Sequence, residues 1–219
     1  MFSGQVRLLQ HAICYASESV DAVVQGTESL PTPCEGWDLQ ALLLHLNRSI
    51  DELHQSIALE PADRDAEDDD CRSSTTHLAA TFRSRAGLLL QSCVKTERAG
   101  RRIAVGDLSL TSGWVVVVGA AEIAVHGWDI SVACGFQRSI PAPLALGLLS
   151  LLQLVVDDAW RQSLFGPAIA VSPLASPSDQ LVAFLGRRPF SSFADGRDVS
   201  SRGQAKSFCA PMGLRTRRA

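Results

Sequence analysis

Apolar residues recur every three or four positions between residues 39 and 57, which is the clearest pattern in the chain. Such spacing lines up side chains along one face of an α-helix. The apolar positions are Leu39, Leu42, Leu43, Leu46, Ile50, Leu53 and Ile57. Asp38 is well suited to cap the first turn, and Trp37 is placed to pack over the start of the helix. The pattern therefore predicts an amphipathic helix that begins after Asp38.

Helical periodicity marks five further segments, which cover approximately residues 6–24, 75–94, 114–134, 144–162 and 179–185. Gly135 follows one of them and is a typical helix stop. The segment 144–162 is apolar on most sides, which predicts a central place in the core. The connection at 100–113 shows strand-like alternation at Ile103 and Val105. The chain as a whole predicts an all-α fold.

The 219-residue chain is 46% hydrophobic, which is ample for a single core. We expect one helical domain over residues 1–190. Residues 191–219 are rich in serine, glycine and arginine without periodicity, so we expect them to form a disordered basic tail. The acidic run at 60–70 lacks the glycine and the distal glutamate of an EF-hand loop. We therefore interpret it as a solvated connection.

Charge and cysteine usage narrow the classes of partner and compartment. A formal net charge of −3 argues against a general nucleic-acid binder. The six cysteines form no CxxC pair and no export signal is evident, which favours reduced thiols in a cytoplasmic protein. The run 144–156 is too short to span a bilayer. We expect no nucleic-acid or membrane partner, and either a monomer or a homodimer.

Candidate chemistry lies in the segment 114–134. Glu122 and His126 are four residues apart, so on a helix they share one face with apolar neighbours. A carboxylate and an imidazole in such a place are costly unless they are paired or bound to a metal. Asp129 lies one turn further along the same face, and His45 lies on the flank of the apolar stripe of its own helix.

Imidazole nitrogen and carboxylate oxygen suit zinc, nickel or iron. One hypothesis is that His45, Glu122 and His126 share a divalent metal ion. The alternatives are a simple Glu122–His126 ion pair and a hydrogen-bonded His45 at a helix interface. Asp129 would either orient a ligand imidazole, or hold a metal-bound water, or pair with an arginine or lysine.

Other residues carry weaker signals. Cys34 precedes the helix that contains His45, and it is either reactive or a buried structural thiol. Trp37 and Trp128 are interpreted as packing anchors. His54 lies on the side of its helix opposite His45 and is expected to face solvent.

Three motifs carry a resemblance to a known family: TPCEGWDLQALLLHL at 32–46, AAEIAVHGWDISVACG at 120–135 and LVAFLGRRP at 181–189. The first two resemble the signatures of the mycothiol-dependent maleylpyruvate isomerase N-terminal-like proteins. These belong to the DinB/YfiT-like superfamily of metal-binding helical bundles. The third resembles the closing motif of a short actinobacterial branch of that group.

The resemblance implies a DinB-like four-helix bundle with one or two extra short helices. It also implies a metal held by His45, Glu122 and His126, and a cytoplasmic location in an organism that uses mycothiol. The implied activity is that of a transferase or isomerase that joins a small thiol to an electrophilic substrate through a metal-activated thiol or water. The alternatives are a non-catalytic metal-binding bundle, structural or sensing, and a bundle without metal.

Overall fold

The computed structural model describes residues 2–58, 73–95, 102–105, 108–156, 165–190 and 214–215. Within these ranges it contains six α-helices and a small three-stranded sheet. The predicted all-α class, a helical bundle with short extra helices, is confirmed. The acidic run at 60–70 lies outside the described residues, so its interpretation as a solvated connection stays a prediction.

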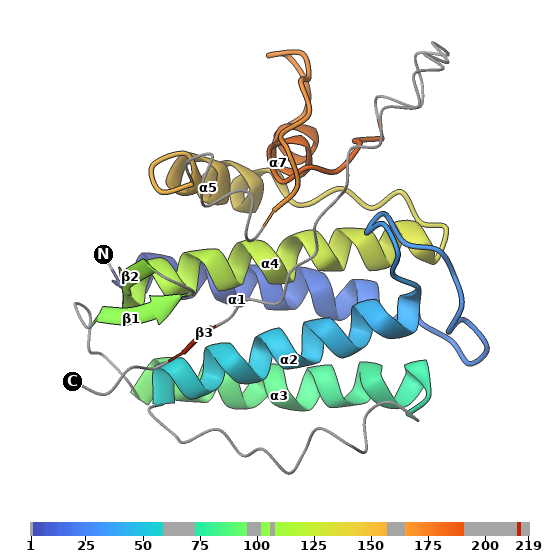
Figure 1. The fold of residues 1–219 in the computed structure, drawn as a ribbon, viewed down its shortest axis with the longest axis horizontal. Helices are drawn as coiled ribbons and strands as arrows, with labels where there is room; N and C mark the ends of the chain where they lie inside the picture. Colours follow the sequence, from blue (N-terminus) through green and yellow to red (C-terminus); the bar gives the residue numbers. More distant parts are fainter. Residues whose placement is uncertain are drawn as a thin grey trace.

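Four long helices form the bundle (Figure 1): α1 Phe2–Val20, α2 Leu39–Ala58, α3 Thr75–Lys95 and α4 Ser112–Ala133. Helix α4 packs against α1 and α2, and α3 closes the ring by packing against α2 and α1. The order around the bundle is therefore α1, α4, α2, α3. This order places α2 and α4, which carry the candidate site, side by side.

Helix α2 follows its predicted pattern. All seven residues of the predicted stripe, from Leu39 to Ile57, are buried. The Asp38 carboxylate accepts a hydrogen bond of 2.8 Å from the backbone N–H of Ala41, which confirms it as the helix cap. The buried stripe sets how α2 is rotated in the bundle, and His45 on its flank faces Glu122 of α4.

Helix α4 is the central helix. It is long and apolar enough to cross a membrane, but 94% of its most apolar window is buried inside the protein. Its apolar composition is therefore accounted for by its place in the core. A Cβ atom added to Gly127 would lie 2.8 Å from the Cα of Ala16, so this glycine allows α1 and α4 to approach closely beside His126.

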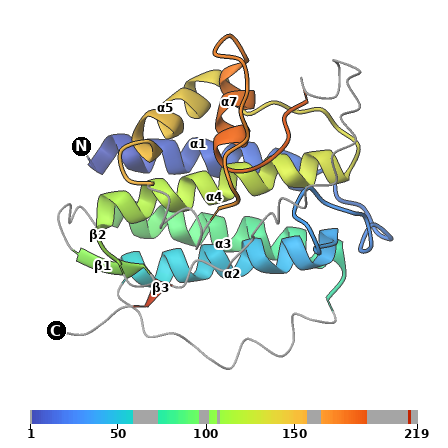
Figure 2. The ribbon, with the colours of Figure 1, turned by 45° about the horizontal axis from the view of Figure 1, so that its top comes forward.

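Helices α5 (Ala142–Leu152) and α7 (Pro177–Phe184) lie outside the four-helix bundle, on the side of α1 and α4 (Figure 2). The prediction of a central helix over 144–162 is wrong in two respects. First, the helix ends at Leu152. Residues 157–164 lie outside the described part of the chain. Second, the helix is not central. Only one face of α5 covers the core, and Leu146 is 54% exposed.

Helix α7 begins two residues earlier than the predicted start at 179. The side chain of Ser176 caps it by accepting a hydrogen bond from the backbone N–H of Asp179, and Pro177 occupies the first turn. The chain then turns at Gly186, whose φ of 83° is in the left-handed region that favours glycine. This turn brings the next residue back toward α4.

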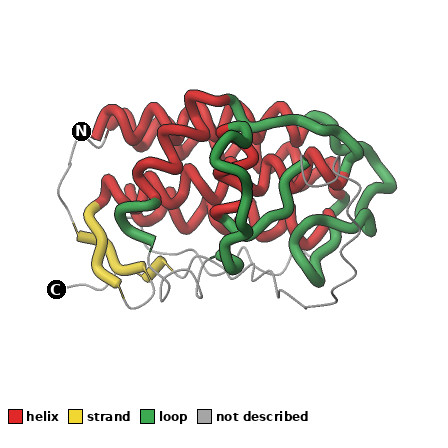
Figure 3. The backbone as a smooth tube through the Cα atoms, turned by 90° about the horizontal axis from the view of Figure 1, so that it is seen from above, coloured by secondary structure: helices red, strands yellow, loops and turns green. Residues whose placement is uncertain are grey.

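A small antiparallel sheet lies at one end of the bundle (Figure 3), in the order β2-β1-β3. Its strands are β1 Arg102–Val105, β2 Leu108–Thr111 and β3 Leu214–Arg215. The strand-like alternation at Ile103 and Val105 is thus found in β1. Strand β3 is the one described part of the segment 191–219, so the disorder predicted for the rest and the domain boundary at 190 stay predictions.

Candidate metal centre

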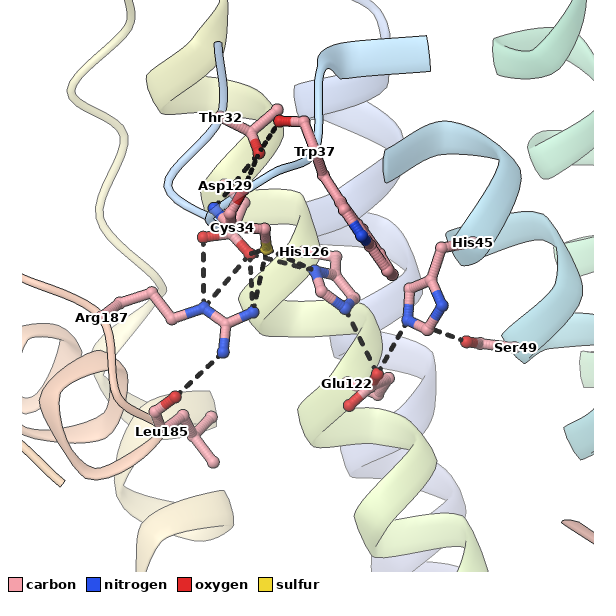
Figure 4. A network of polar contacts seen from close by, with 10 residues as sticks. All are labelled: Thr32, Cys34, Trp37, His45, Ser49, Glu122, His126, Asp129, Leu185 and Arg187. Atoms are coloured by element: carbon pink, nitrogen blue, oxygen red, sulfur yellow. Dashed lines mark hydrogen bonds and ion pairs between the residues drawn. The ribbon is translucent and has the colours of Figure 1, made fainter. Parts of the chain in front are cut away.

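Helices α2 and α4 bring the three predicted ligand residues together in the interior. Glu122 and His126 lie one turn apart on α4, and His45 faces them from α2 (Figure 4). His45 is 6% exposed, Glu122 3% and His126 1%. The Nε2 atom of His45 lies 3.0 Å from Oε1 of Glu122, and Nε2 of His126 lies 3.2 Å from the same oxygen. Two imidazoles therefore converge on one buried carboxylate oxygen.

This arrangement fits a divalent metal ion. One atom from each residue lies within 4.8 Å of the other two. Bonds of about 2.0 to 2.2 Å in tetrahedral geometry place neighbouring ligand atoms roughly 3.3 to 3.5 Å apart. The two nitrogen–oxygen distances of 3.0 and 3.2 Å are therefore within a few tenths of an ångström of those in a bound state. The donor set, two imidazoles and a carboxylate, is one that zinc, nickel and iron accept.

Asp129 holds the other side of the His126 ring. Its Oδ2 atom lies 3.0 Å from Nδ1 of His126, and the side chain is fully buried. Histidine ligands of metals commonly donate their second ring nitrogen to such a carboxylate, which fixes the ring orientation. The pairing thus fixes which nitrogen of His126 faces Glu122.

Arg187 pairs with Asp129 and was not predicted as a site residue. Its Nη2 atom lies 3.1 Å from Oδ2 of Asp129, and its side chain is almost fully buried. Asp129 thus combines two of the roles left open by the sequence: it orients a histidine and pairs with an arginine. Arg187 does occur in the motif LVAFLGRRP, but nothing in that motif indicates a contact with a residue 58 positions earlier.

Cys34 lies in the same buried network. Its Sγ atom is 3.2 Å from Oδ2 of Asp129 and 3.2 Å from Nη2 of Arg187. The side chain is 1% exposed, and the backbone N–H of Cys34 donates to Oγ1 of Thr32. The structure therefore places Cys34 as a buried thiol. Among the described residues, Cys34, His126 and Asp129 form a second group with metal-ligand geometry.

The partners of Glu122 and Asp129 favour the ionised form of both carboxylates. Burial would raise the pKa of Glu122, but hydrogen bonds from His126 and His45 outweigh it and lower that pKa. Burial also opposes ionisation of Asp129, yet the charge of Arg187 and the hydrogen bond with His126 lower its pKa. Both carboxylates are therefore ionised.

The pKa values of the two histidines are shifted in opposite directions. Burial lowers the pKa of His45, more than its hydrogen bond with Glu122 raises it. Burial alone would lower the pKa of His126 as well, but hydrogen bonds with Asp129, Cys34 and Glu122 raise it well above the usual value. These contacts favour the charged form of His126 when no metal is bound. The Nε2 atom of His126 must lose its proton before it can bind a metal.

The remaining candidates lie away from the cluster or support it. The ring centre of Trp37 lies 4.6 Å from that of His45, so this indole packs directly on the site. Trp128 is buried and packs against Phe190, as expected of an anchor. The prediction that His54 faces solvent is wrong, because its side chain is half-buried and its Nε2 lies 2.7 Å from Oγ of Ser92 on α3.

Fold and site together define a class of protein: a helical bundle with a buried histidine–glutamate–histidine group between two of its long helices. The family model of the mycothiol maleylpyruvate isomerase N-terminal domain matches residues 11–131, more than half of the chain, and the chain belongs to this family. The match includes His45, Glu122, His126 and Asp129 and ends before Arg187. No match to a curated protein or to a solved structure was found.

Proposed function

We propose that this protein binds one divalent metal ion through His45, Glu122 and His126 and uses it in transferase or isomerase chemistry on a small thiol. The observation that carries the proposal is the convergence of two imidazole nitrogens on one buried carboxylate oxygen, at 3.0 and 3.2 Å. Zinc is the ion that best suits this donor set, and nickel and iron are the alternatives.

The residues around the site have distinct tasks in this proposal. His45 and His126 present their Nε2 atoms, and Glu122 supplies the negative charge that offsets a dication. Asp129 keeps the proton of His126 on Nδ1, which leaves Nε2 as the coordinating atom. When bound, the metal would favour the ionised form of a thiol or a water near neutral pH.

Membership of the family supports the identity of the thiol. The description of the family names mycothiol and an isomerase. From this description we infer that mycothiol, or an adduct of it, is the thiol substrate. The second substrate is then an electrophilic small molecule, to which the thiolate sulfur adds. A cytoplasmic location follows from the same proposal, because a low-molecular-weight thiol is kept reduced there.

The test is a conjugation assay. Metal-loaded protein is incubated with mycothiol and a halobimane, and formation of the fluorescent thioether is followed over time. We expect turnover by the wild-type protein and by His77→Ala, which removes an exposed histidine of α3. We expect the His126→Ala substitution to abolish turnover. Equal rates for the wild-type and His126→Ala proteins would refute catalysis by this site.

A non-catalytic metal-binding bundle is the second candidate. The burial of all three side chains, each at most 6% exposed, and the packing of Trp37 over His45 favour it. In that case the ion organises the fold or senses metal supply. The protein would then bind metal and melt at a lower temperature without it, but the conjugation assay would show no turnover with any thiol tested.

A further inference from the structure

Arg187 is held in the interior by contacts from several directions. Its Nη1 atom donates to the carbonyl of Leu185 at 2.9 Å, and its Nε atom lies 3.3 Å from Oδ2 of Asp129. The Nη2 atom reaches both Asp129 Oδ2 and Cys34 Sγ. The backbone N–H of Arg187 donates to Val182, which ties the residue to the end of α7. One guanidinium thus joins the loop before α2, helix α4 and the chain after α7 (Figure 4).

We propose that Arg187 is a positioning residue of the metal centre. It fixes Asp129, and through Asp129 it fixes the ring of His126. It also couples metal binding to the seating of residues 165–190, which we call the closing segment. This inference rests on the proposed metal site and adds a residue outside the matched family domain, which ends at residue 131.

The carboxylate of Asp129 lies against the guanidinium of Arg187. It is fully buried, so an ionised carboxylate there depends on partners in the protein rather than on water. Arg187 supplies a full positive charge with two nitrogens, Nε and Nη2, directed at this carboxylate. Without it, the Asp129 carboxylate would lose the two nitrogens that hold it in place, and its hydrogen bond with Nδ1 of His126 would weaken.

Arg187 also determines the side of the His126 ring at which a metal binds. On the Nδ1 side of the ring, Cys34 and Asp129 also offer ligand atoms. The guanidinium of Arg187 already contacts both of them, and its positive charge opposes a cation at that place. The Nε2 side has no such cation among the residues drawn in Figure 4, and there Glu122 and His45 converge. Arg187 therefore directs the metal to the Nε2 side.

Arg187 also couples metal binding to the seating of the closing segment. The closing segment meets the bundle through Arg187 and through Phe190 against Trp128. Ser178 also holds it to the connection after α4, because its side chain accepts a hydrogen bond from the backbone N–H of Ile140. If Arg187 strengthens metal binding through Asp129, metal binding must strengthen the seating of Arg187 by the same free energy. Zinc should then protect the closing segment from local opening.

Zinc affinity tests the proposal directly. We compare the wild-type protein with Arg187→Gln, Arg187→Lys and Arg188→Gln by competition with a chromophoric chelator. Arg188 is the matched control, because it is the neighbouring arginine but is exposed. Loss of an outer partner of a metal ligand typically weakens binding about 10- to 100-fold. We expect that loss for Arg187→Gln, a smaller one for Arg187→Lys and none for Arg188→Gln.

A double-mutant cycle separates positioning from a general effect on stability. In an Asp129→Asn background, Arg187→Gln should produce no further loss of zinc affinity, because the path to His126 is already broken. Hydrogen exchange of the wild-type protein provides a measurement that needs no variant. Added zinc should slow exchange of the backbone amides of residues 178–190.

The outcomes are distinguishable. Folded Arg187→Gln protein with wild-type zinc affinity would overturn the proposal, as would an equal loss in the two backgrounds. Exchange of the closing segment that does not respond to bound zinc would also overturn it. These results would leave the proposed metal site intact, whereas a wild-type protein that binds no zinc would refute both.

Discussion

His126 uses both of its ring nitrogens, and this is what makes the site specific at the scale of single residues. Nδ1 faces Asp129 at 3.0 Å, and Nε2 faces Glu122 at 3.2 Å. With both contacts made, the ring has one orientation and its role in metal binding is confined to one atom. The orientation of His126 therefore depends on Asp129, which is not one of the three proposed metal ligands.

Replacing Asp129 by asparagine tests this dependence. The amide removes the charge, so it leaves the guanidinium of Arg187 buried without its ion-pair partner. Breaking a buried ion pair costs about 3 to 5 kcal/mol in the free energy of unfolding, and zinc affinity should also fall about 10- to 100-fold. Urea unfolding and chelator competition measure the two effects.

The matched control for this substitution is Asp21→Asn. The Asp21 carboxylate pairs with Arg83 at the surface and its side chain is 62% exposed. Exposed ion pairs contribute at most about 1 kcal/mol, and Asp21 lies outside the site. An Asp129→Asn protein no less stable than the Asp21→Asn protein, with unchanged zinc affinity, would contradict the role given to Asp129.

Sequence reasoning found the residues close to one another along the helices but not the contact between distant segments. Glu122, His126 and Asp129 could be grouped because helix periodicity puts them on one face. Joining His45 to them was a hypothesis based on its place on the flank of its own helix, which the family resemblance then supported. Arg187 could not be assigned, because its partner is set by the turn at Gly186 and by packing of α7, neither of which leaves a periodic signal.

At the scale of elements, the packing of α4 decides how its polar residues are presented. Gly127 follows His126 and lies against Ala16 of α1, with 2.8 Å between an added Cβ and the Cα of Ala16. The two backbones are thus as close as glycine permits, and this contact fixes the rotation of α4 next to the site. Any side chain at this position would push the helices apart.

Gly127→Ala tests the close approach against Gly87→Ala in α3. An alanine at position 87 would meet nothing within 4 Å, so it should stabilise the protein by up to about 1 kcal/mol through helix propensity. At position 127 the overlap should instead destabilise it by about 1 to 3 kcal/mol. Thermal and urea unfolding compare the two variants. If Gly127→Ala were as stable as Gly87→Ala, the packing described for α1 and α4 would be wrong.

Most elements with amphipathic patterns were predicted well, but the helix predicted at 6–24 lies four residues earlier at each end, as α1. The predicted helices at 39–57, 75–94 and 114–134 match α2, α3 and α4 within two residues at each end. The helix predicted at 144–162 was too long because a segment that is apolar all round contains no signal for its end or its exposed face. Helix α7 begins earlier than predicted because Ser176 caps its first turn and Pro177 occupies that turn.

At the scale of the whole molecule, a metal at this site would join α2 to α4 across the centre of the bundle. The ligand residues come from positions 45, 122 and 126, so binding requires the folded chain. An ion that binds only the native state stabilises it, by about 2.7 kcal/mol at 100 times its dissociation constant. Removal of the metal should therefore lower the stability of the whole folded chain, not only that of the site.

Calorimetry with and without a chelator measures this effect. For a chain of this size, each kcal/mol corresponds to about 2 to 4 °C in the melting temperature. The metal-loaded wild-type protein should melt roughly 5 to 10 °C higher than the chelated protein. Glu122→Ala protein should melt at the same temperature in both conditions. A wild-type melting temperature that chelation leaves unchanged would exclude stabilisation by a bound metal.

Elemental analysis shows whether His45, Glu122 and His126 hold one metal ion. The protein is purified without a metal-binding tag, reconstituted with zinc and freed of excess metal by gel filtration. We expect near one equivalent of zinc per chain in the wild-type and His77→Ala proteins, and far less in the His126→Ala protein. A wild-type protein without zinc after reconstitution, or a His126→Ala protein with the wild-type amount, would contradict this expectation.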